Sequence, residues 1–230
     1  MSDIDLEAKR QQRHRTRDRI LAAARDIVMR DGYAGLTMRR LAAAVDYSPA
    51  ALYLHFAGRD EIALILRHEA LSALASALDE QALDEQTLEV ADIHPIQAVG
   101  RAWLNFARTQ PQLYALALLE RVPSAVGQVD GSAPTASGEA AQAGAAVQRS
   151  VLRALRPESA ATLVYGLDAR AQTVMAVLHG LASLQLLQPG MLTVPVDALL
   201  QLALGSLVRG WPGAPAPVLG SPSIGEVSGL

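Results

Sequence analysis

The chain contains no cysteine, and only 4% of its 230 residues are aromatic. The absence of Cys excludes a disulfide framework, a thiolate metal site and a cysteine nucleophile. Ala and Leu dominate instead, while aromatic and β-branched residues are sparse, and this mixture favours helices. We therefore expect an all-α protein.

Long hydrophobic runs are also missing. The longest apolar stretch, residues 174–187, is interrupted by His179 and Gln185, and it is too short for the ~20 residues that a membrane helix needs. The N-terminus is charged and does not resemble a signal peptide. These features predict a cytoplasmic protein with no membrane partner.

No motif for catalysis or for a cofactor is complete. His68 and Glu69 begin the zinc pattern H-E-x-x-H, but Ser72 stands where the second His is needed. The phosphate-binding glycine patterns and the G-x-S-x-G nucleophile motif are absent. His179 has no His or carboxylate partner at metal-ligand spacing. We therefore expect no enzyme activity, no cofactor and no metal site.

Positive charge is concentrated near the N-terminus. Residues 9–40 hold ten Lys or Arg against three Asp, whereas residues 41–230 hold ten basic against seventeen acidic residues. The net charge of −3 thus hides a basic end on an acidic body, as suits a protein that presents one end to phosphate. Residues 1–15, acidic and then basic, are interpreted as a flexible arm that either contacts DNA or is solvated.

Two short helices separated by a tight turn are predicted within the basic end. Thr37 can cap the first helix by accepting a hydrogen bond from a free backbone N–H, and Ser48 can cap the second. Pro49 then occupies the first helical position, where a missing N–H costs nothing. The chain breaks between the helices at Asp46. Such a pair forms a helix-turn-helix, whose second helix enters the DNA major groove.

The same segment resembles the DNA-binding domain of TetR-type transcriptional regulators. The resemblance covers residues 16–62 and rests on the opening helix ILAAARDIVMRDGY, on T-x-R-x-L-A from Thr37, and on S-P-x-x-L-Y-x-H-F from Ser48. Asp46 replaces the usual turn Gly, and Arg59 replaces the usual Lys. Asp tolerates left-handed backbone geometry and Arg keeps the phosphate-binding charge, so both departures fit the family.

Several side chains of this segment are candidates for DNA contact. Arg39 is suited to a guanine or a phosphate, and two small alanines one turn into the recognition helix could touch thymine methyls. Tyr47 is assigned to either the core or the DNA. Arg59, at a helix N-terminus, is placed to bind a phosphate. The candidate DNA-binding residues are Thr37, Arg39, Tyr47, Ser48, Ala50, Ala51, Tyr53, His55 and Arg59.

The remainder of the chain is divided by composition and helical spacing. A first helix is expected over residues 16–31 and a long connecting helix over 59–79, with the DNA-binding domain at 16–60. A helical effector and dimerisation domain follows at 61–210. Residues 211–230 are rich in Pro and Gly and are predicted to be disordered.

A second resemblance lies in this larger domain. The pattern R-A-W-L-x-F-A-x-x-x-P-x-L-Y begins at Arg101, and H-G-L-A-S-L begins at His179. Both are similar to the ligand-binding half of TetR regulators whose C-terminal domain is named for Trp, His and Gly. Met175 lies near the place of a Trp that this chain lacks. The resemblance implies a mostly apolar small-molecule effector, with His179 as its polar anchor or as a hydrogen-bonded core residue. The candidate ligand-binding residues are Trp103, Phe106, Tyr114, Leu118, Met175, Leu178 and His179.

The last two predicted helices, 160–187 and 195–209, are apolar over more of their surface than one core requires. The resemblance implies that two such helices from each chain form a four-helix dimer interface. The candidate interface residues are Leu184, Leu187, Leu199, Leu202 and Leu207.

These features together predict a dimeric repressor that binds a palindromic operator and is released by its ligand. An activator, or a regulator of the same fold that has no ligand, is an alternative. A helical interaction protein that never binds DNA is another, although the basic end argues against it.

Overall fold

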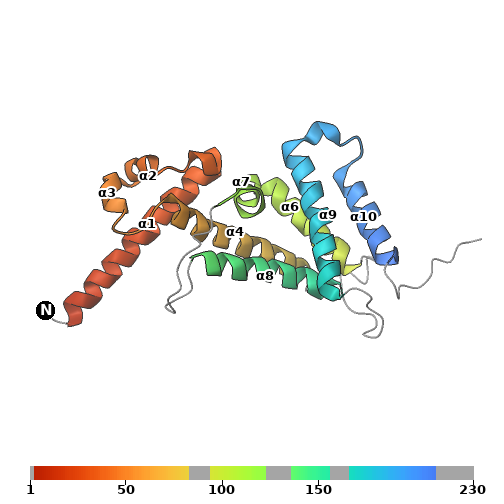
Figure 1. The fold of residues 1–230 in the computed structure, drawn as a ribbon, viewed down its shortest axis with the longest axis horizontal. Coiled ribbons are helices and arrows are strands. Elements are labelled where there is room, and N and C mark those ends of the chain that lie inside the picture. The colour runs from red at the N-terminus through yellow and green to blue at the C-terminus, as the bar shows by residue number, and fades with distance from the viewer. Residues whose placement is uncertain (1–2, 83–93, 123–135, 156–165, 211–230) are drawn as a thin grey trace, which may run out of the picture.

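The computed structural model describes residues 3–82, 94–122, 136–155 and 166–210, and every regular element in these ranges is helical (Figure 1). Three helices at the N-terminus form a head. A long helix then leads to a larger helical body. No helix within the described ranges is both long enough and apolar enough to cross a membrane. The expected all-α class with a helix-turn-helix head is therefore confirmed.

The head consists of α1 (Asp3–Gly35), α2 (Met38–Val45) and α3 (Pro49–Leu52). Its core forms because α1 and α2 each turn an apolar stripe toward the same point, which the chain after α3 closes. The core contains Ile20, Ala24, Ile27, Val28, Leu36, Leu41, Ala42, Val45, Leu52 and Phe56.

The first helix begins much earlier than the sequence analysis expects. The segment interpreted as a flexible arm, residues 1–15, is helical from Asp3 onward. The run from Glu7 to Arg13 consists almost entirely of strong helix formers, which explains this extension. At the other end Gly32 takes φ 71°, so the helix breaks there as predicted, although one further helical turn follows up to Gly35.

Helix α4 (Arg59–Ala82) belongs to both parts of the molecule. Its N-terminal half contributes Ile62 and Leu66 to the core of the head, and its C-terminal half contributes Leu74 and Leu78 to the core of the body. The prediction that this helix connects the head to the body is therefore correct. In Figure 1, α4 and α8 (Ala136–Ala154) run side by side along the bottom of the body.

The rest of the body is built from α6 (Pro95–Thr109), α9 (Leu167–Leu187) and α10 (Val196–Gly210), with a short 3₁₀ turn, η2 (Pro189–Met191), between the last two. Helix α6 packs against both α9 and α10. A Cβ on Gly100 of α6 would lie 2.9 Å from methyl groups of Leu200 and of Leu204. The absence of a side chain at this position therefore allows α10 to approach α6 closely.

One segment joins the two cores. It consists of a short α7 (Pro111–Tyr114) followed by a π-helical turn, η1 (Ala115–Leu119). Tyr114 and Ala117 lie in the core of the body, but Leu116 lies in the core of the head. The wider π-helical turn thus directs neighbouring side chains into different cores.

Some expectations fall outside the described residues. These include the predicted disordered tail at 211–230 and the first six residues of the helix predicted over 160–187.

Candidate nucleic-acid interface and effector site

The helix-turn-helix has the local bonds that the sequence predicts. The Thr37 hydroxyl oxygen accepts a hydrogen bond from the Arg40 backbone N–H at 3.2 Å, and the Ser48 oxygen accepts one from the Ala51 N–H at 3.1 Å. Asp46 adopts the left-handed conformation, with φ 61°. Both predicted N-caps and the predicted turn geometry are therefore confirmed.

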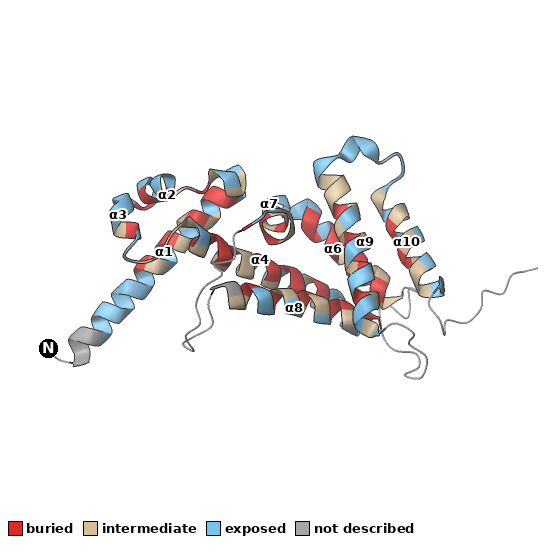
Figure 2. Ribbon diagram, viewed as in Figure 1, coloured by how far each residue is buried: buried red, intermediate tan, exposed pale blue. Residues whose placement is uncertain are grey.

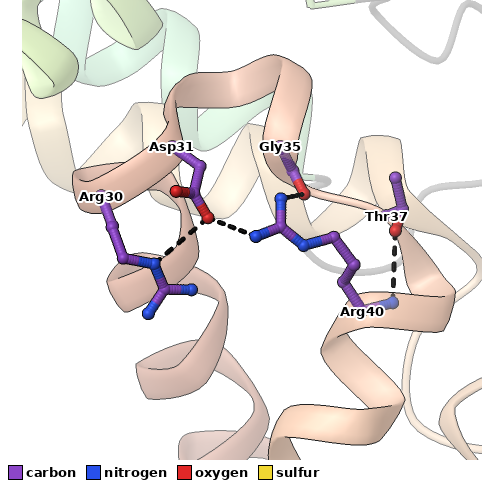
Figure 3. A network of polar contacts seen from close by, with 5 residues as sticks. All are labelled: Arg30, Asp31, Gly35, Thr37 and Arg40. Atoms are coloured by element: carbon purple, nitrogen blue, oxygen red, sulfur yellow. Dashed lines mark hydrogen bonds and ion pairs between the residues drawn. The ribbon is translucent and has the colours of Figure 1, made fainter.

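A polar network fixes the corner between α1 and α2 (Figure 3). The Arg40 guanidinium forms an ion pair with Asp31 and donates to the Gly35 carbonyl at 3.0 Å. Arg30 contacts the same Asp31 carboxylate at 3.2 Å. The hydrogen bond from Arg40, together with the charge of Arg30, lowers the pKa of Asp31. Both Arg39 and Arg40 are exposed. Arg40 is engaged within the protein, whereas the side chain of Arg39 has no hydrogen bond or ion pair among the described residues.

The outer face of the motif carries exposed polar and aromatic groups. The side chains of Arg39 and Ala50 are exposed, and Ala51 is half-buried. Tyr53 is 57% exposed and Tyr47 is 37% exposed, so Tyr47 is not part of the core. These exposed side chains supply one cation and two phenols, which are donors to phosphate oxygens.

Three arginines of α1 donate hydrogen bonds to backbone carbonyls of the helix-turn-helix. The sequence analysis did not predict these contacts. Arg13 donates to the Leu54 carbonyl at 3.1 Å, Arg17 donates to the His55 carbonyl, and Arg19 donates to the Val45 carbonyl. Val45 is the last residue of α2, and Leu54 and His55 follow shortly after the end of α3. Helix ends leave backbone acceptors unpaired. The basic residues of α1 thus have a structural role as well as a charge.

His55 and Arg59 are more enclosed than the other candidates. The Nδ1 atom of His55 is buried and has no hydrogen-bond partner in the described part of the chain. The Arg59 guanidinium lies 4.0 Å from the centre of the Tyr33 ring and donates to the Tyr33 carbonyl at 3.4 Å. Desolvation raises the pKa of the Tyr33 phenol. Arg59 therefore packs α4 onto the end of α1, whatever else it contacts.

In the body, three of the candidate effector residues form one hydrogen-bonded chain. The Trp103 indole N–H donates to the Tyr114 oxygen at 3.1 Å, and that oxygen lies 3.0 Å from Nδ1 of His179. The rings of Trp103 and Tyr114 meet edge to face, with their centroids 6.5 Å apart. Trp103 and Tyr114 are fully buried, and burial raises the pKa of Tyr114 to about 12. The phenol therefore stays neutral at any physiological pH.

The other effector candidates lie around this chain. Phe106 and Leu178 are buried, whereas Leu118 and Met175 are half-buried against the core. A cleft of about 400 Å³ opens between α4 and α6, and Phe106 is the one candidate that reaches it. The remaining lining residues are Ala77, Glu80, Gln81, Arg101, Ala102, Asn105, Thr109 and Gln110. The cleft is therefore more polar than the expected pocket.

The candidate dimer residues lie on α9 and α10. Leu187 and Leu202 are 64% and 65% exposed, respectively. The other three, Leu184, Leu199 and Leu207, are half-buried. Figure 2 shows both helices with exposed and partly buried faces turned away from the rest of the body.

Comparisons with known proteins agree with this architecture. A family described as bacterial regulatory proteins of the tetR family matches residues 20–65, and the tetracyclin repressor-like C-terminal domain matches residues 96–207. The regulator TcmR of Streptomyces glaucescens is 32% identical over 89 residues, or 39% of this chain. That match spans 36% of the length of TcmR.

Solved structures share the fold over most of the chain. A protein of unknown function from Rhodococcus sp. RHA1 is 25% identical, with a TM-score of 0.61, and the alignment covers 85% of this chain and 94% of that one. Thermus thermophilus FadR, a TetR-family repressor solved with lauroyl-CoA, is 16% identical with a TM-score of 0.55, and the alignment covers 89% and 99% of the two chains. Because its head and its body each match domains of one family, and together these matches cover more than half of its length, the chain belongs to the TetR family of DNA-binding transcriptional regulators.

Proposed function

We propose that this regulator is a homodimeric repressor that binds a palindromic operator in the cytoplasm and is released from it by a small, mostly apolar ligand. The observation that carries the proposal is the exposed face of the helix-turn-helix. Arg39 and Tyr53 are exposed on this motif, whereas its helix caps form hydrogen bonds within the protein. Exposed donors on a rigid frame are what phosphate and base contacts require.

Within that interface, Arg39 would contact a guanine or a phosphate, and Ala50 with Ala51 would contact thymine methyls. Tyr47, Tyr53 and Thr37 would donate to phosphate oxygens. His55 and Arg59 are half-buried, so each side chain would have to change its conformation to bind a phosphate. Ser48 would act mainly through the cap that starts α3.

Dimerisation is supported by the exposed leucines of the last two helices. Leu187 and Leu202 would be costly to leave in water, at about 25 cal/mol per Å² of apolar surface. Burying them against a second copy would give the two-fold symmetric pair of heads that a palindromic site requires.

The effector proposal is supported by the chain from Trp103 to His179. An apolar ligand seated beside these rings would find His179 as a polar anchor. The cleft that Phe106 lines lies against α6, the same helix that carries Trp103. Release from DNA requires the ligand to favour the non-binding conformation, and ~100-fold differential affinity corresponds to about 2.7 kcal/mol.

Selection from random-sequence duplexes tests the proposal. A repressor of this kind should recover a palindrome with half-site centres ~34–36 Å apart or somewhat more. A reporter placed behind the recovered site should be silenced by the protein. Activation of the reporter would support the alternative of an activator, and recovery of unrelated sequences only would contradict operator binding.

A further inference from the structure

The N-terminal extension of α1, residues 7–15, contributes no side chain to the hydrophobic core of the head. Residues 7–15 are all exposed, and burial begins at Thr16 (Figure 2). Figure 1 shows this part of α1 projecting past α3, away from the body. At ~1.5 Å per residue the nine residues extend the helix by about 13 Å. The helix is thus continued well beyond the part that the hydrophobic core requires.

Lys9 and Arg10 lie on the side of this extension that faces the helix-turn-helix. Lys9 precedes Arg13 by four residues and Arg10 precedes it by three, so all three share one face of the helix. Arg13 donates to the Leu54 carbonyl, just after α3. This bond fixes the orientation of the face. Lys9 and Arg10 therefore lie about one turn beyond the C-terminal end of the recognition helix.

Lys9 and Arg10 have no acidic partner among the side chains that the structure describes. Neither Lys9 nor Arg10 forms an ion pair within the described residues, whereas Arg17 and Arg25 of the same helix pair with Glu61 and Glu69 of α4. An exposed basic face beside the recognition helix is complementary to a phosphate backbone.

We propose that residues 7–15 of α1 form a second DNA-binding element, in which Lys9 and Arg10 bind phosphates that flank the half-site read by α3. The extension presents these side chains from a continuous helix rather than from a flexible arm. Arg13 positions it through the Leu54 carbonyl. The inference rests on DNA binding by the head, but it does not depend on repression, on a ligand or on a particular operator sequence.

Arg15 supplies a matched control. It has the same charge and the same exposure as Arg10, but it follows five residues later, which places it about 140° around the helix on the opposite side. Gln substitutions keep helix propensity close to that of Arg. Arg10→Gln and Arg15→Gln therefore remove equal charge from exposed positions of the same helical extension, on opposite sides of the helix.

The experiment measures affinity for duplex DNA against salt concentration, using a site selected from random duplexes with about eight flanking base pairs on each side. Each phosphate contact that is lost should reduce the slope of log K against log salt by about 0.9. We expect this reduction for Arg10→Gln and about twice as much for the double variant Lys9→Gln, Arg10→Gln, with little change for Arg15→Gln. Circular dichroism should show unchanged helicity in all three variants.

A second duplex, trimmed to the selected site, tests the location of the contact. The double variant and the unmodified protein should give the same slope on the trimmed duplex, because the flanking phosphates are absent. An unchanged slope for Arg10→Gln on the long duplex, or equal reductions for Arg10→Gln and Arg15→Gln, would overturn the inference.

The same measurement on a mixed-sequence duplex separates this inference from the proposed function. Equal affinity for mixed and selected sequences would contradict operator recognition. A difference between Arg10→Gln and Arg15→Gln in the salt slope on mixed-sequence DNA would still support the helical extension as a phosphate-binding element.

Discussion

The indole N–H of Trp103 donates to the phenolic oxygen of Tyr114, 3.1 Å away, and both side chains are fully buried. This bond joins α6 to α7. Two residues after Tyr114 the chain enters the core of the head at Leu116. The hydrogen-bonded chain in the body is therefore only two residues along the backbone from a residue of the head's core.

The first prediction concerns this bond. Tyr114→Phe should lower the free energy of unfolding by about 1–3 kcal/mol, because the buried indole N–H of Trp103 loses its acceptor. Urea denaturation measures the loss, and Tyr53→Phe, which alters an exposed phenol, should leave stability unchanged. Equal stability of Tyr114→Phe and the unmodified protein would contradict a stabilising role for the bond.

The same tyrosine should make stability depend on alkaline pH. Its pKa is raised from 10.0 to about 12 in the folded protein. Its contribution is therefore fully present below pH 10.0 and is lost as the pH rises through about 12, because the unfolded chain ionises first. Stability measured between these pH values should fall less steeply for Tyr114→Phe than for the unmodified protein.

Substitution of Arg39 should affect DNA binding, whereas substitution of Arg40 should affect stability. Arg39→Ala should weaken operator binding by about 1–3 kcal/mol if it contacts a guanine. Stability should not change, because the exposed Arg39 side chain makes no bond to the described part of the protein. Arg40→Ala should lower stability because it breaks the bonds to Asp31 and Gly35. Fluorescence anisotropy with labelled DNA and thermal unfolding distinguish the two effects. Arg39→Ala binding with unchanged affinity would remove Arg39 from the interface.

Acid should weaken the corner between α1 and α2. The hydrogen bond from Arg40 lowers the pKa of Asp31 below 3.8, so its contribution is present above that pH and is lost as the pH falls through the lower folded value. Asp31→Asn should therefore reduce the acid sensitivity of thermal unfolding. If both proteins lost stability in parallel below pH 3.8, the ion pair would not be responsible.

Charge on the last two helices should prevent dimerisation. Leu187→Glu and Leu202→Glu each place a carboxylate on the proposed interface, where burial of an unpaired charge is costly. Sedimentation at micromolar concentration should show monomers. Met191→Glu is the control, because Met191 is 66% exposed on η2 and is not part of the proposed interface. A dimer in all three variants would place the interface elsewhere.

Ligand response should depend on the chain from Trp103 to His179. The chain has two tryptophans, Trp103 and Trp211, so a Trp211→Phe background makes the fluorescence report on Trp103 alone. This fluorescence should change when an inducing compound binds. The double variant Phe106→Ala, His179→Leu should lose this change and require more compound for release from DNA. Unchanged induction of the double variant would place the effector site outside these residues.

Local sequence by itself determined the helical class, the two helix caps and the turn between α2 and α3. Thr37 and Ser48 each bond an N–H three residues away, and Asp46 takes the left-handed turn that its type tolerates. These interactions involve only near neighbours, so residue type and spacing are sufficient to predict them. The helical run after Glu7 was also present in the sequence, but its charge pattern led to the prediction of a flexible arm.

Only the tertiary structure decided which charges are free and which core each side chain enters. Arg13 and Arg17 bond carbonyls 41 and 38 residues away, and those acceptors are unpaired because helices happen to end beside α1. The same applies to Arg40, whose partner Asp31 comes from another helix. Periodicity shows which face of a helix is apolar, but the partner of that face depends on how helices meet in space, and this is set by the packing of the whole chain.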